Sequence, residues 1–156
     1  MQDQPALPDR EKVLISILGV QTNNTGERDS IELVTEGQLY AKNGVDYITY
    51  RESVVTGGDQ TTGSTTMLKL SPQNMTLLRS GSVEQRQEFR PGELCVSSYI
   101  TPHGSFNMGI FTNTFQVSRS ETGKVAGIDV EYELELDGHW QSTNTLSILI
   151  KGDHHN

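Results

Sequence analysis

The sequence predicts an all-β fold, a single up-and-down β-barrel of about 8–10 antiparallel strands. Three observations lead to this prediction. Apolar and polar residues alternate with a period of two in segment after segment, and turn-forming residues separate these segments. The composition combines a modest 33% of hydrophobic residues with 15 glycines. No stretch shows an apolar stripe at the helical period of ~3.6 residues. Closure into a barrel would also protect the sheet edges.

The N-terminal half of the chain contains four predicted strands. Lys12–Thr22 includes "VLISILGV", which is apolar on both faces, and Ser30–Lys42 alternates apolar with polar residues. Val45–Ser53 follows the turn signal "NG", which is typical of a two-residue type I′ hairpin. Thr65–Leu70 completes this half, with turn residues on both sides.

The C-terminal half contains six further predicted strands, separated by the turn signals "SG", "PG", "PHG", "TG" and "DG". The clearest strand reads "IDVEYELEL", in which apolar residues occupy one face and acidic residues the other. The six strands are Met75–Ser80, Ser82–Arg90, Leu94–Thr101, Ser105–Ser118, Lys124–Asp137 and Trp140–Lys151.

Two hairpins can be placed in register from the sequence. In "YAKNGVDY" the turn chemistry and the side-chain pattern agree on a two-residue Asn-Gly loop. That loop pairs Leu39 with Ile48, Gly37 with Tyr50 and, on the outer face, Glu36 with Arg51 as an exposed ion pair.

The hairpin "ELELDGHWQSTN" gives two conflicting indications. A two-residue Asp-Gly loop pairs Glu135 with Trp140 and would place Leu146 opposite Asp129. A loop of three residues, Asp137 to His139, instead pairs apolar residues with apolar residues. Because a slip of one residue inverts the faces of a strand, we expect burial to decide in favour of three residues. The resulting pairs are Leu136–Trp140, Val130–Leu146 and Ile128–Ile148.

The predicted registers give the barrel a mixed interior, apolar with several neutral hydrogen-bonding groups. A buried polar group without a partner costs ~1–3 kcal/mol, so these groups must bond one another, bond water or face a ligand. The polar side chains expected to face inward are Thr35, Gln85, Gln87, Ser98, Ser142 and Asn144, with Tyr50 and Tyr132 beside them.

Composition and charge limit the classes of function. The formal net charge of −8 without basic clusters argues against nucleic acid and anionic membranes as partners. A single cysteine, Cys95, no N-terminal signal pattern and no apolar run long enough for a membrane helix predict a cytoplasmic protein. We expect one barrel domain over residues 11–151, a flexible arm at 1–10 and a frayed C-terminus at 152–156.

The ordered set of segments resembles the YwiB-like family of small bacterial proteins of unknown function, described as calycin-like β-barrels. The resemblance covers nearly the whole chain after the arm and implies a barrel related in shape to lipocalins, with no activity established. The segments are "TEGQLY" (35–40), "YITYRES" (47–53), "LLRSGSVEQRQEF" (77–89), "YITPHGSFNMGIFT" (99–112), "GIDVEYELELDG" (127–138) and "NTLSILIK" (144–151).

Isolated side chains suggest chemistry only weakly. His103 in "TPHGS" is best interpreted as a hairpin corner, with ligand contact as the alternative. Arg79 is expected on the outer face beside a Ser-Gly turn, although a guanidinium holding an anion at the barrel mouth is the second interpretation. We expect Cys95 to face outward and Trp140 to close one barrel end. Because no nucleophile, base and orienting group come together, we predict a non-enzyme without cofactor or metal.

The sequence therefore supports two hypotheses. The first is a binding module that takes a small, mostly neutral ligand inside the barrel. The second is an interaction protein, such as a homodimer, whose two-sided apolar strands are covered from outside. The candidate ligand-binding residues are Thr35, Tyr50, Gln85, Gln87, Ser98, His103, Tyr132, Ser142 and Asn144.

Overall fold

The computed structural model describes residues 10–56, 60–81 and 84–152. Within these ranges the chain forms ten strands and no helix, so no described helix is long and apolar enough to cross a membrane. All ten predicted strands are present. They are β1 (Glu11–Asn23), β2 (Arg28–Lys42), β3 (Val45–Thr56), β4 (Gln60–Leu70), β5 (Met75–Gly81), β6 (Glu84–Phe89), β7 (Leu94–Thr101), β8 (Gly104–Arg119), β9 (Val125–Leu136) and β10 (His139–Gly152).

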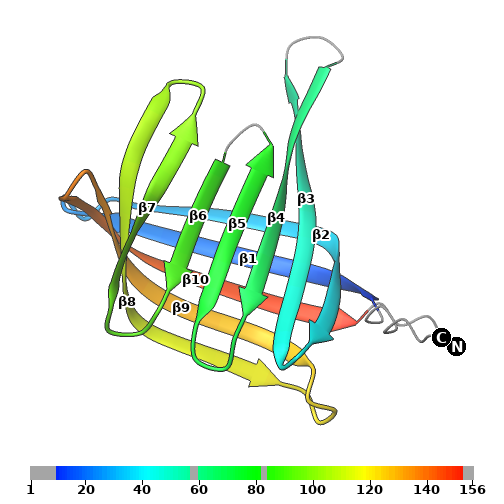
Figure 1. Ribbon diagram of the computed structural model, residues 1–156. Coiled ribbons are helices and arrows are strands. Elements are labelled where there is room, and N and C mark those ends of the chain that lie inside the picture. The colour runs from blue at the N-terminus through cyan, green and yellow to red at the C-terminus, as the bar shows by residue number, and fades with distance from the viewer. Residues whose placement is uncertain (1–9, 57–59, 82–83, 153–156) are drawn as a thin grey trace, which may run out of the picture.

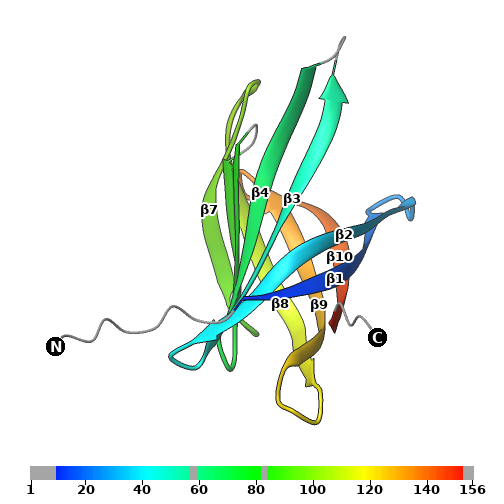
Figure 2. The same cartoon turned by 90° about the vertical axis from the view of Figure 1, so that its right-hand side faces the viewer.

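The strands form one closed barrel in which each strand pairs antiparallel with its sequence neighbour and β1 pairs with β10. This confirms the predicted up-and-down barrel. In Figure 1, β1, β2, β9 and β10 run across the view behind β3–β7, which stand steeply and alternate in direction. The β3–β4 hairpin extends beyond the other strands of the barrel wall (Figure 2).

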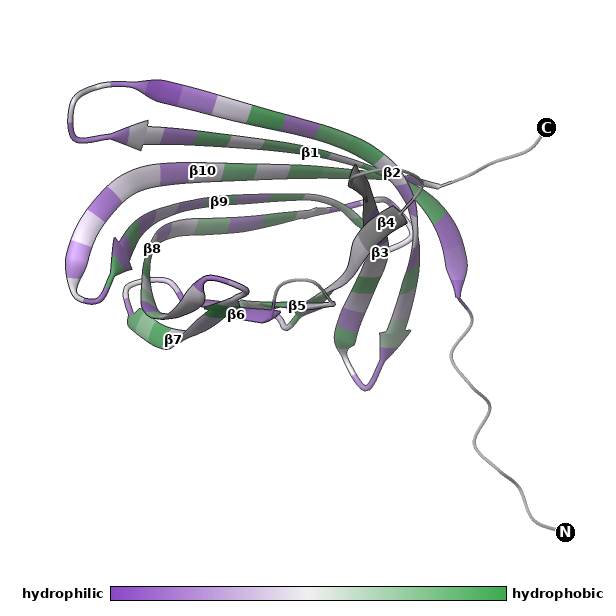
Figure 3. Ribbon diagram, turned by 90° about the horizontal axis from the view of Figure 1, so that it is seen from above, coloured by the Kyte–Doolittle hydropathy of each residue, from purple (hydrophilic) through white to green (hydrophobic). Residues whose placement is uncertain are grey.

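The apolar core fills the barrel interior, as the period-two alternation along the strands predicts (Figure 3). Even-numbered residues of β9 from Ile128 to Leu136 pack in this core, together with inward residues of each of the other nine strands. The contribution of β2 is Leu39 and Leu33, and that of β7 is Tyr99. The largest fully buried side chains include Phe89, Ile15, Ile48, Leu68, Leu70, Met75, Ile110, Ile128 and Ile148.

The β2–β3 hairpin has the predicted two-residue loop, since Asn43 and Gly44 have φ angles of 55° and 78°, as a type I′ turn requires. The pairs Leu39–Ile48 and Gly37–Tyr50 are also confirmed. The ladder ends at Gly37–Tyr50, and the Glu36 carboxylate lies 2.9 Å from the Lys12 ammonium on β1. The predicted pairing of Glu36 with Arg51 was therefore wrong, because β2 leaves β3 one residue too early.

The β9–β10 hairpin satisfies both of the conflicting indications. Asp137 and Gly138 form a two-residue turn with φ angles of 50° and 82°, and Trp140 pairs with Glu135, so the predicted three-residue loop was wrong. A β-bulge between Trp140 and Ser142 then shifts the register by one residue. Beyond the bulge the expected core pairs Val130–Leu146 and Ile128–Ile148 are present.

The faces of β7 are the reverse of those predicted. Ser98 pairs with Asn107 on the outer face and is exposed, together with Val96 and Ile100. The inward face carries Cys95, opposite the buried Ile110, so the expectation of an outward cysteine was also wrong. The strand "LCVSSYIT" is apolar at alternate positions on both faces, so its pattern alone does not specify the inward one.

Two residues that the sequence assigned to the chain ends, Arg10 and Gly152, contact the barrel. Arg10, expected in the flexible arm, donates to the Gln38 side chain at 3.2 Å and lies 4.6 Å from the centroid of the Tyr40 ring. Gly152, expected in the frayed C-terminus, pairs with Val13 at the end of β10. The remaining residues of both predicted segments, 1–9 and 153–156, lie outside the described residues.

Candidate functional site

A row of polar and aromatic side chains crosses six consecutive strands on the inner face of the barrel. Each member is the direct antiparallel partner of the next, and directly opposed residues share one face of a sheet. The neighbouring row toward the core contains Ile48, Leu68 and Leu77, which are buried. We name this set the polar row; its members are Tyr50, Thr66, Arg79, Gln85, Tyr99 and Phe106.

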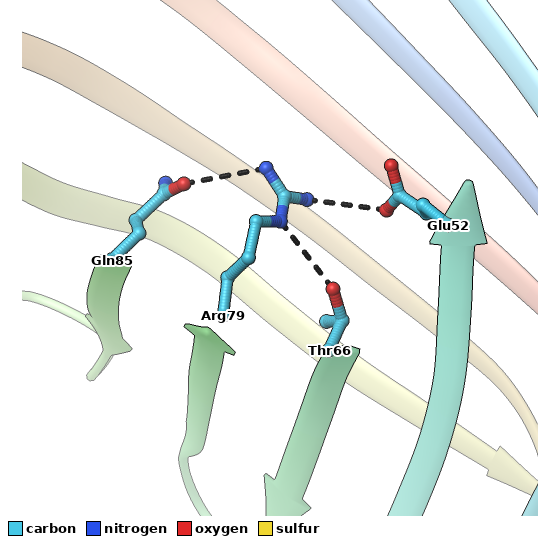
Figure 4. Close-up of polar contacts among 4 residues, drawn as sticks. All are labelled: Glu52, Thr66, Arg79 and Gln85. Atoms are coloured by element: carbon cyan, nitrogen blue, oxygen red, sulfur yellow. Dashed lines mark hydrogen bonds and ion pairs between the residues drawn. The ribbon is translucent and has the colours of Figure 1, made fainter. Parts of the chain in front are cut away.

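Arg79 is the cation of the polar row and points into the barrel, so its predicted place on the outer face was wrong. The ladder pairs Arg79 with Gln85, which leaves a longer β5–β6 connection than the predicted two-residue Ser-Gly loop. The guanidinium Nε donates to Thr66 Oγ1 at 3.3 Å, and Nη1 donates to Gln85 Oε1 at 3.3 Å. Nη2 lies 3.4 Å from Glu52 Oε1 (Figure 4).

Two tyrosine hydroxyls lie within the electrostatic influence of Arg79. Burial raises the pKa of Tyr50 and the Glu52 charge adds to the rise, whereas the Arg79 charge and hydrogen bonds with Thr66 and Arg79 oppose it. Burial also raises the pKa of Tyr132, against a hydrogen bond with Asn144 and the Arg79 charge. Both phenols are therefore protonated at neutral pH and can donate hydrogen bonds.

The opposite wall of the interior carries the polar groups predicted on β9 and β10. Ser142 Oγ donates to Asn144 Oδ1 at 3.0 Å, and both residues are buried. Asn144 pairs with Tyr132, whose ring contacts Phe89 edge-on with a centroid distance of 5.0 Å. The adjacent Thr112 is fully buried, and its hydroxyl has no hydrogen-bond partner among the described residues.

The two predicted glutamines lie on the inner face of β6. Gln85 belongs to the polar row, and Gln87 lies one step deeper, opposite Leu77. Their amides contact the thioether sulfur of Met108, which is 3.9 Å from Gln85 Nε2 and 3.1 Å from Gln87 Nε2. Since a thioether is only a weak acceptor, both amides keep unused hydrogen-bonding capacity.

The remaining predicted site residues are not all brought to this region. Thr35 faces inward opposite the buried Ile15, just beyond the point where β2 leaves β3. His103 lies on the exposed tip of the β7–β8 hairpin, between Thr101 and Gly104, which confirms the hairpin-corner interpretation. Together with the outward Ser98, it lies apart from the polar groups of the interior.

Arg79, Thr66, Tyr99 and Phe106 were missing from the predicted site residues. A Ser-Gly signal was interpreted as the β5–β6 turn, and this register put Arg79 outside. The pairing of β4 with β5 sets the direction of Thr66 and Arg79. Thr66 opposes Arg79 on the same face on which the apolar Leu68 opposes Leu77.

Two hollows border the polar end of the barrel. One of about 420 Å³ lies where β2 separates from β3; Gly37 and Tyr50 line it from the inner face, and the rest of its lining consists of outer-face residues, namely Glu36, Gln38, Thr49, Arg51 and Thr65. The other, of about 160 Å³, is lined by Ile31, Tyr132, Asn144 and neighbouring residues of β1 and β10. Ile31 is on the inward face of β2 yet 74% exposed, so this end of the interior presents apolar surface to solvent.

The outer face of β9 has a separate polar cluster around Glu133. Burial alone would raise the pKa of this carboxyl, but hydrogen bonds from Thr143, Trp140 and Asn113 outweigh it and lower the pKa. Trp140 Nε1 donates to Glu133 at 2.8 Å, and the indole is 44% exposed. Trp140 is therefore an outer-face residue, and the prediction that it closes one barrel end was wrong.

The outer face of β1, β2 and β10 carries an apolar patch. Ser16 lies at its centre, directly between Val34 and Leu149, which are 63% and 56% exposed. Leu14 and Leu18 lie on either side of Ser16 along β1 and are about 40% exposed. We call Leu14, Leu18, Val34 and Leu149 the outer patch.

Comparison with known proteins decides the family. A family model described as a domain of unknown function, DUF1934, matches residues 15–148, most of the barrel. The chain belongs to this family. It is 24% identical over 130 residues to the uncharacterized beta-barrel protein YwiB of Bacillus subtilis strain 168, which covers 83% of this chain and 87% of that protein. The resemblance inferred from the sequence is thus confirmed.

A solved structure gives independent support for the fold of this DUF1934 protein. The crystal structure of the ywiB protein from Bacillus subtilis matches with a TM-score of 0.74 at 20% sequence identity, over 93% of this chain and 94% of that chain. At this identity the likeness concerns the barrel alone. Among the described residues of our chain, no group of three or more His, Cys, Asp or Glu side chains is arranged to hold a metal ion.

Proposed function

We propose that this protein is a non-catalytic binding module that takes a small ligand into the polar end of its barrel. The observation that carries the proposal is the polar row, in which Thr66, Arg79 and Gln85 face inward side by side on three strands. A barrel that only fills its interior gains nothing from such groups, because buried polar atoms cost free energy unless they are fully bonded. Here the contacts of Arg79 with Thr66 and Gln85 are both 3.3 Å long, and Tyr50, at the end of the row, reaches a hollow of about 420 Å³.

Thermal denaturation against a panel of small metabolites tests the proposal. A ligand present at 100 times its dissociation constant adds ~2.7 kcal/mol to the stability of the folded state. We expect such stabilisation in the wild type and in the outer-face control Trp140→Phe, and a smaller effect in Tyr50→Phe and Gln85→Met. Stabilisation by no compound, or stabilisation that the two interior variants leave unchanged, would count against the proposal.

A second function is supported by the outer patch, namely assembly with a second copy of the chain. Contiguous exposed apolar surface on a soluble protein marks interaction sites. The row at Leu14 contains Lys151 and Glu36, and the Glu36 carboxylate lies 2.9 Å from the Lys12 ammonium. The row at Leu18 contains Glu32, Ser147 and, on β9, Asp129. A two-fold axis in the interface along the Val34–Ser16–Leu149 row would bring Lys151 of one copy near Asp129 of the other.

Sedimentation equilibrium tests the assembly. We expect a dimer for the wild type, a shift toward monomer for Lys151→Glu and for Asp129→Lys, and recovery of the dimer when both charges are exchanged. A wild type that stays monomeric at every concentration measured would exclude this second function and leave ligand binding untouched.

A further inference from the structure

Arg79 is held loosely. Its contacts with Thr66, Gln85 and Glu52, of 3.3, 3.3 and 3.4 Å, all exceed the usual N–H···O range of 2.7–3.2 Å, and the Tyr50 hydroxyl is a further hydrogen-bond partner. Two exposed arginines of the same barrel reach their carboxylates at shorter distances, since Arg119 lies 2.8 Å from Asp46 and Arg86 lies 2.8 Å from Glu88, whereas Arg90 lies 3.9 Å from Glu88. The guanidinium of Arg79 therefore forms neither a short nor a two-pronged contact, although its planar geometry suits one.

Glu52, the counter-ion of Arg79, is placed where it can leave. It lies on β3 beyond Tyr50, the last residue of β3 that pairs with β2. The side chain is 32% exposed and contacts Arg79 through one oxygen, so it can rotate toward water without becoming buried and unpaired. When Glu52 turns toward water, a ligand carboxylate can take its place opposite the guanidinium, and the energetic cost is that of losing one ion pair whose side chains are 28% and 32% exposed.

The surroundings of Arg79 supply further donors and an apolar wall. The protonated Tyr50 hydroxyl and the Gln85 amide lie on either side of the guanidinium along the polar row. Phe106, at the far end of the row, and Ile31, across the mouth, are exposed apolar side chains on inward faces. Besides one positive charge, neutral donors and apolar surface, this end of the barrel carries the carboxylates of Glu52 and of Asp29, which lines the same hollow as Ile31. A singly charged organic acid therefore fits better than a phosphate dianion.

We propose that Arg79 binds the carboxylate of a small organic acid with an apolar body, and that this carboxylate displaces Glu52 from the guanidinium. The inference rests on the proposed function and narrows its ligand to an anion, which was the second interpretation of Arg79 from the sequence, in place of the neutral ligand that the sequence favoured. Glu52 stands in for the ligand carboxylate in the free protein.

Isothermal titration with benzoate tests the site, with methyl benzoate and inorganic phosphate as comparison probes. Glu52→Gln removes the internal competitor, and we expect it to tighten benzoate binding on the order of fivefold. We expect Arg79→Met to abolish binding and Arg79→Lys to weaken it, because an ammonium lacks the planar pair of donors. Arg86→Met, on the outer face of the adjacent strand β6, is the matched control and should bind like wild type.

The outcomes separate this inference from the proposed function. Binding of methyl benzoate as strong as that of benzoate, retained in Arg79→Met, would overturn the anion site and keep the binding module. Binding of phosphate without benzoate would overturn the carboxylate assignment. Weaker benzoate binding by Glu52→Gln, in a variant with unchanged circular dichroism, would show that Glu52 supports the ligand and would refute the displacement.

Discussion

The β-bulge of the β9–β10 hairpin contains one extra residue, so we expect β10 to tolerate the deletion of one residue but not of two. Deletion of Gln141 removes the extra residue while Trp140 stays opposite Glu135 and Ser142 stays opposite Leu134. The variant loses only an exposed hydrogen bond from Gln141 to the His139 carbonyl, so we expect a cost below ~1 kcal/mol.

Deletion of the exposed Thr145 also removes the bulge, but it changes the direction of side chains between the bulge and the deleted residue. The bulge disappears and the register from Leu146 onward is kept, but Ser142 and Asn144 turn outward, at a cost of ~1–3 kcal/mol. When both residues are deleted, no extra residue is left to restore the register, and Ile148 and Ile150 must face solvent. Each buried Ile contributes ~1.5–3 kcal/mol, so the double deletion should lose a further ~3–6 kcal/mol.

Urea denaturation of the wild type, both single deletions and the double deletion measures this effect. The cost of the double deletion should exceed the sum of the single costs by several kcal/mol, a large fraction of the ~5–15 kcal/mol that stabilises a domain. Additive costs would refute the reasoning. So would a loss of stability in the Gln141 deletion as large as that in the double deletion.

Three further perturbations follow from local geometry. Gly37→Ala should destabilise the barrel by ~1–3 kcal/mol, because the added Cβ would clash with the Thr49 carbonyl oxygen. Gly19→Ala, whose Cβ would meet nothing within 4 Å, should be neutral or stabilising; equal losses for both in urea would contradict this. Burial raises the pKa of Tyr132 above that of the unfolded chain, so the stability it contributes is complete below ~10 and is lost as the pH rises through the folded pKa. Tyr132→Phe should therefore reduce the loss of unfolding free energy at alkaline pH. An unchanged loss would contradict this role of Tyr132. The lowered pKa of Glu133 has the opposite effect on the pH dependence of stability. The stability that Glu133 contributes is present above the ordinary pKa of ~4.5 and is lost as the pH falls through the folded pKa. Glu133→Gln should reduce the loss of stability on acidification, measured by thermal denaturation at several pH values; an equal loss would rule this out.

The sequence determines the strands well because each pattern is local. The alternation from Ile128 to Leu136 and the Asn-Gly turn before β3 each specify both a strand and its inward face. The prediction failed where two local rules compete. In the β9–β10 hairpin the turn and the core ask for registers that differ by one residue, and a bulge, which no period-two pattern anticipates, satisfies both.

The candidate site could be predicted only in part, because it depends on pairing between strands. Tyr50 follows from the Asn-Gly hairpin, and Gln85 and Asn144 follow from alternation with Phe89 and Leu146 along their strands; the structure places all three on the inner face. The predicted direction of Ser98 was wrong because β7 is apolar on both faces, so burial does not determine which face points inward. Arg79 failed because a Ser-Gly pair looks like a tight turn, whereas the pairing of β5 with β4 and β6 sets its direction.

The most direct test of a ligand site in the polar end of the barrel is amide NMR of the labelled protein during titration with a compound that stabilises it. The account predicts shifts concentrated at Tyr50, Thr66, Arg79 and Gln85, with little change at Leu14 and Leu149 on the outer patch. Shifts confined to the outer face, or saturable binding that leaves the polar row unchanged, would contradict it.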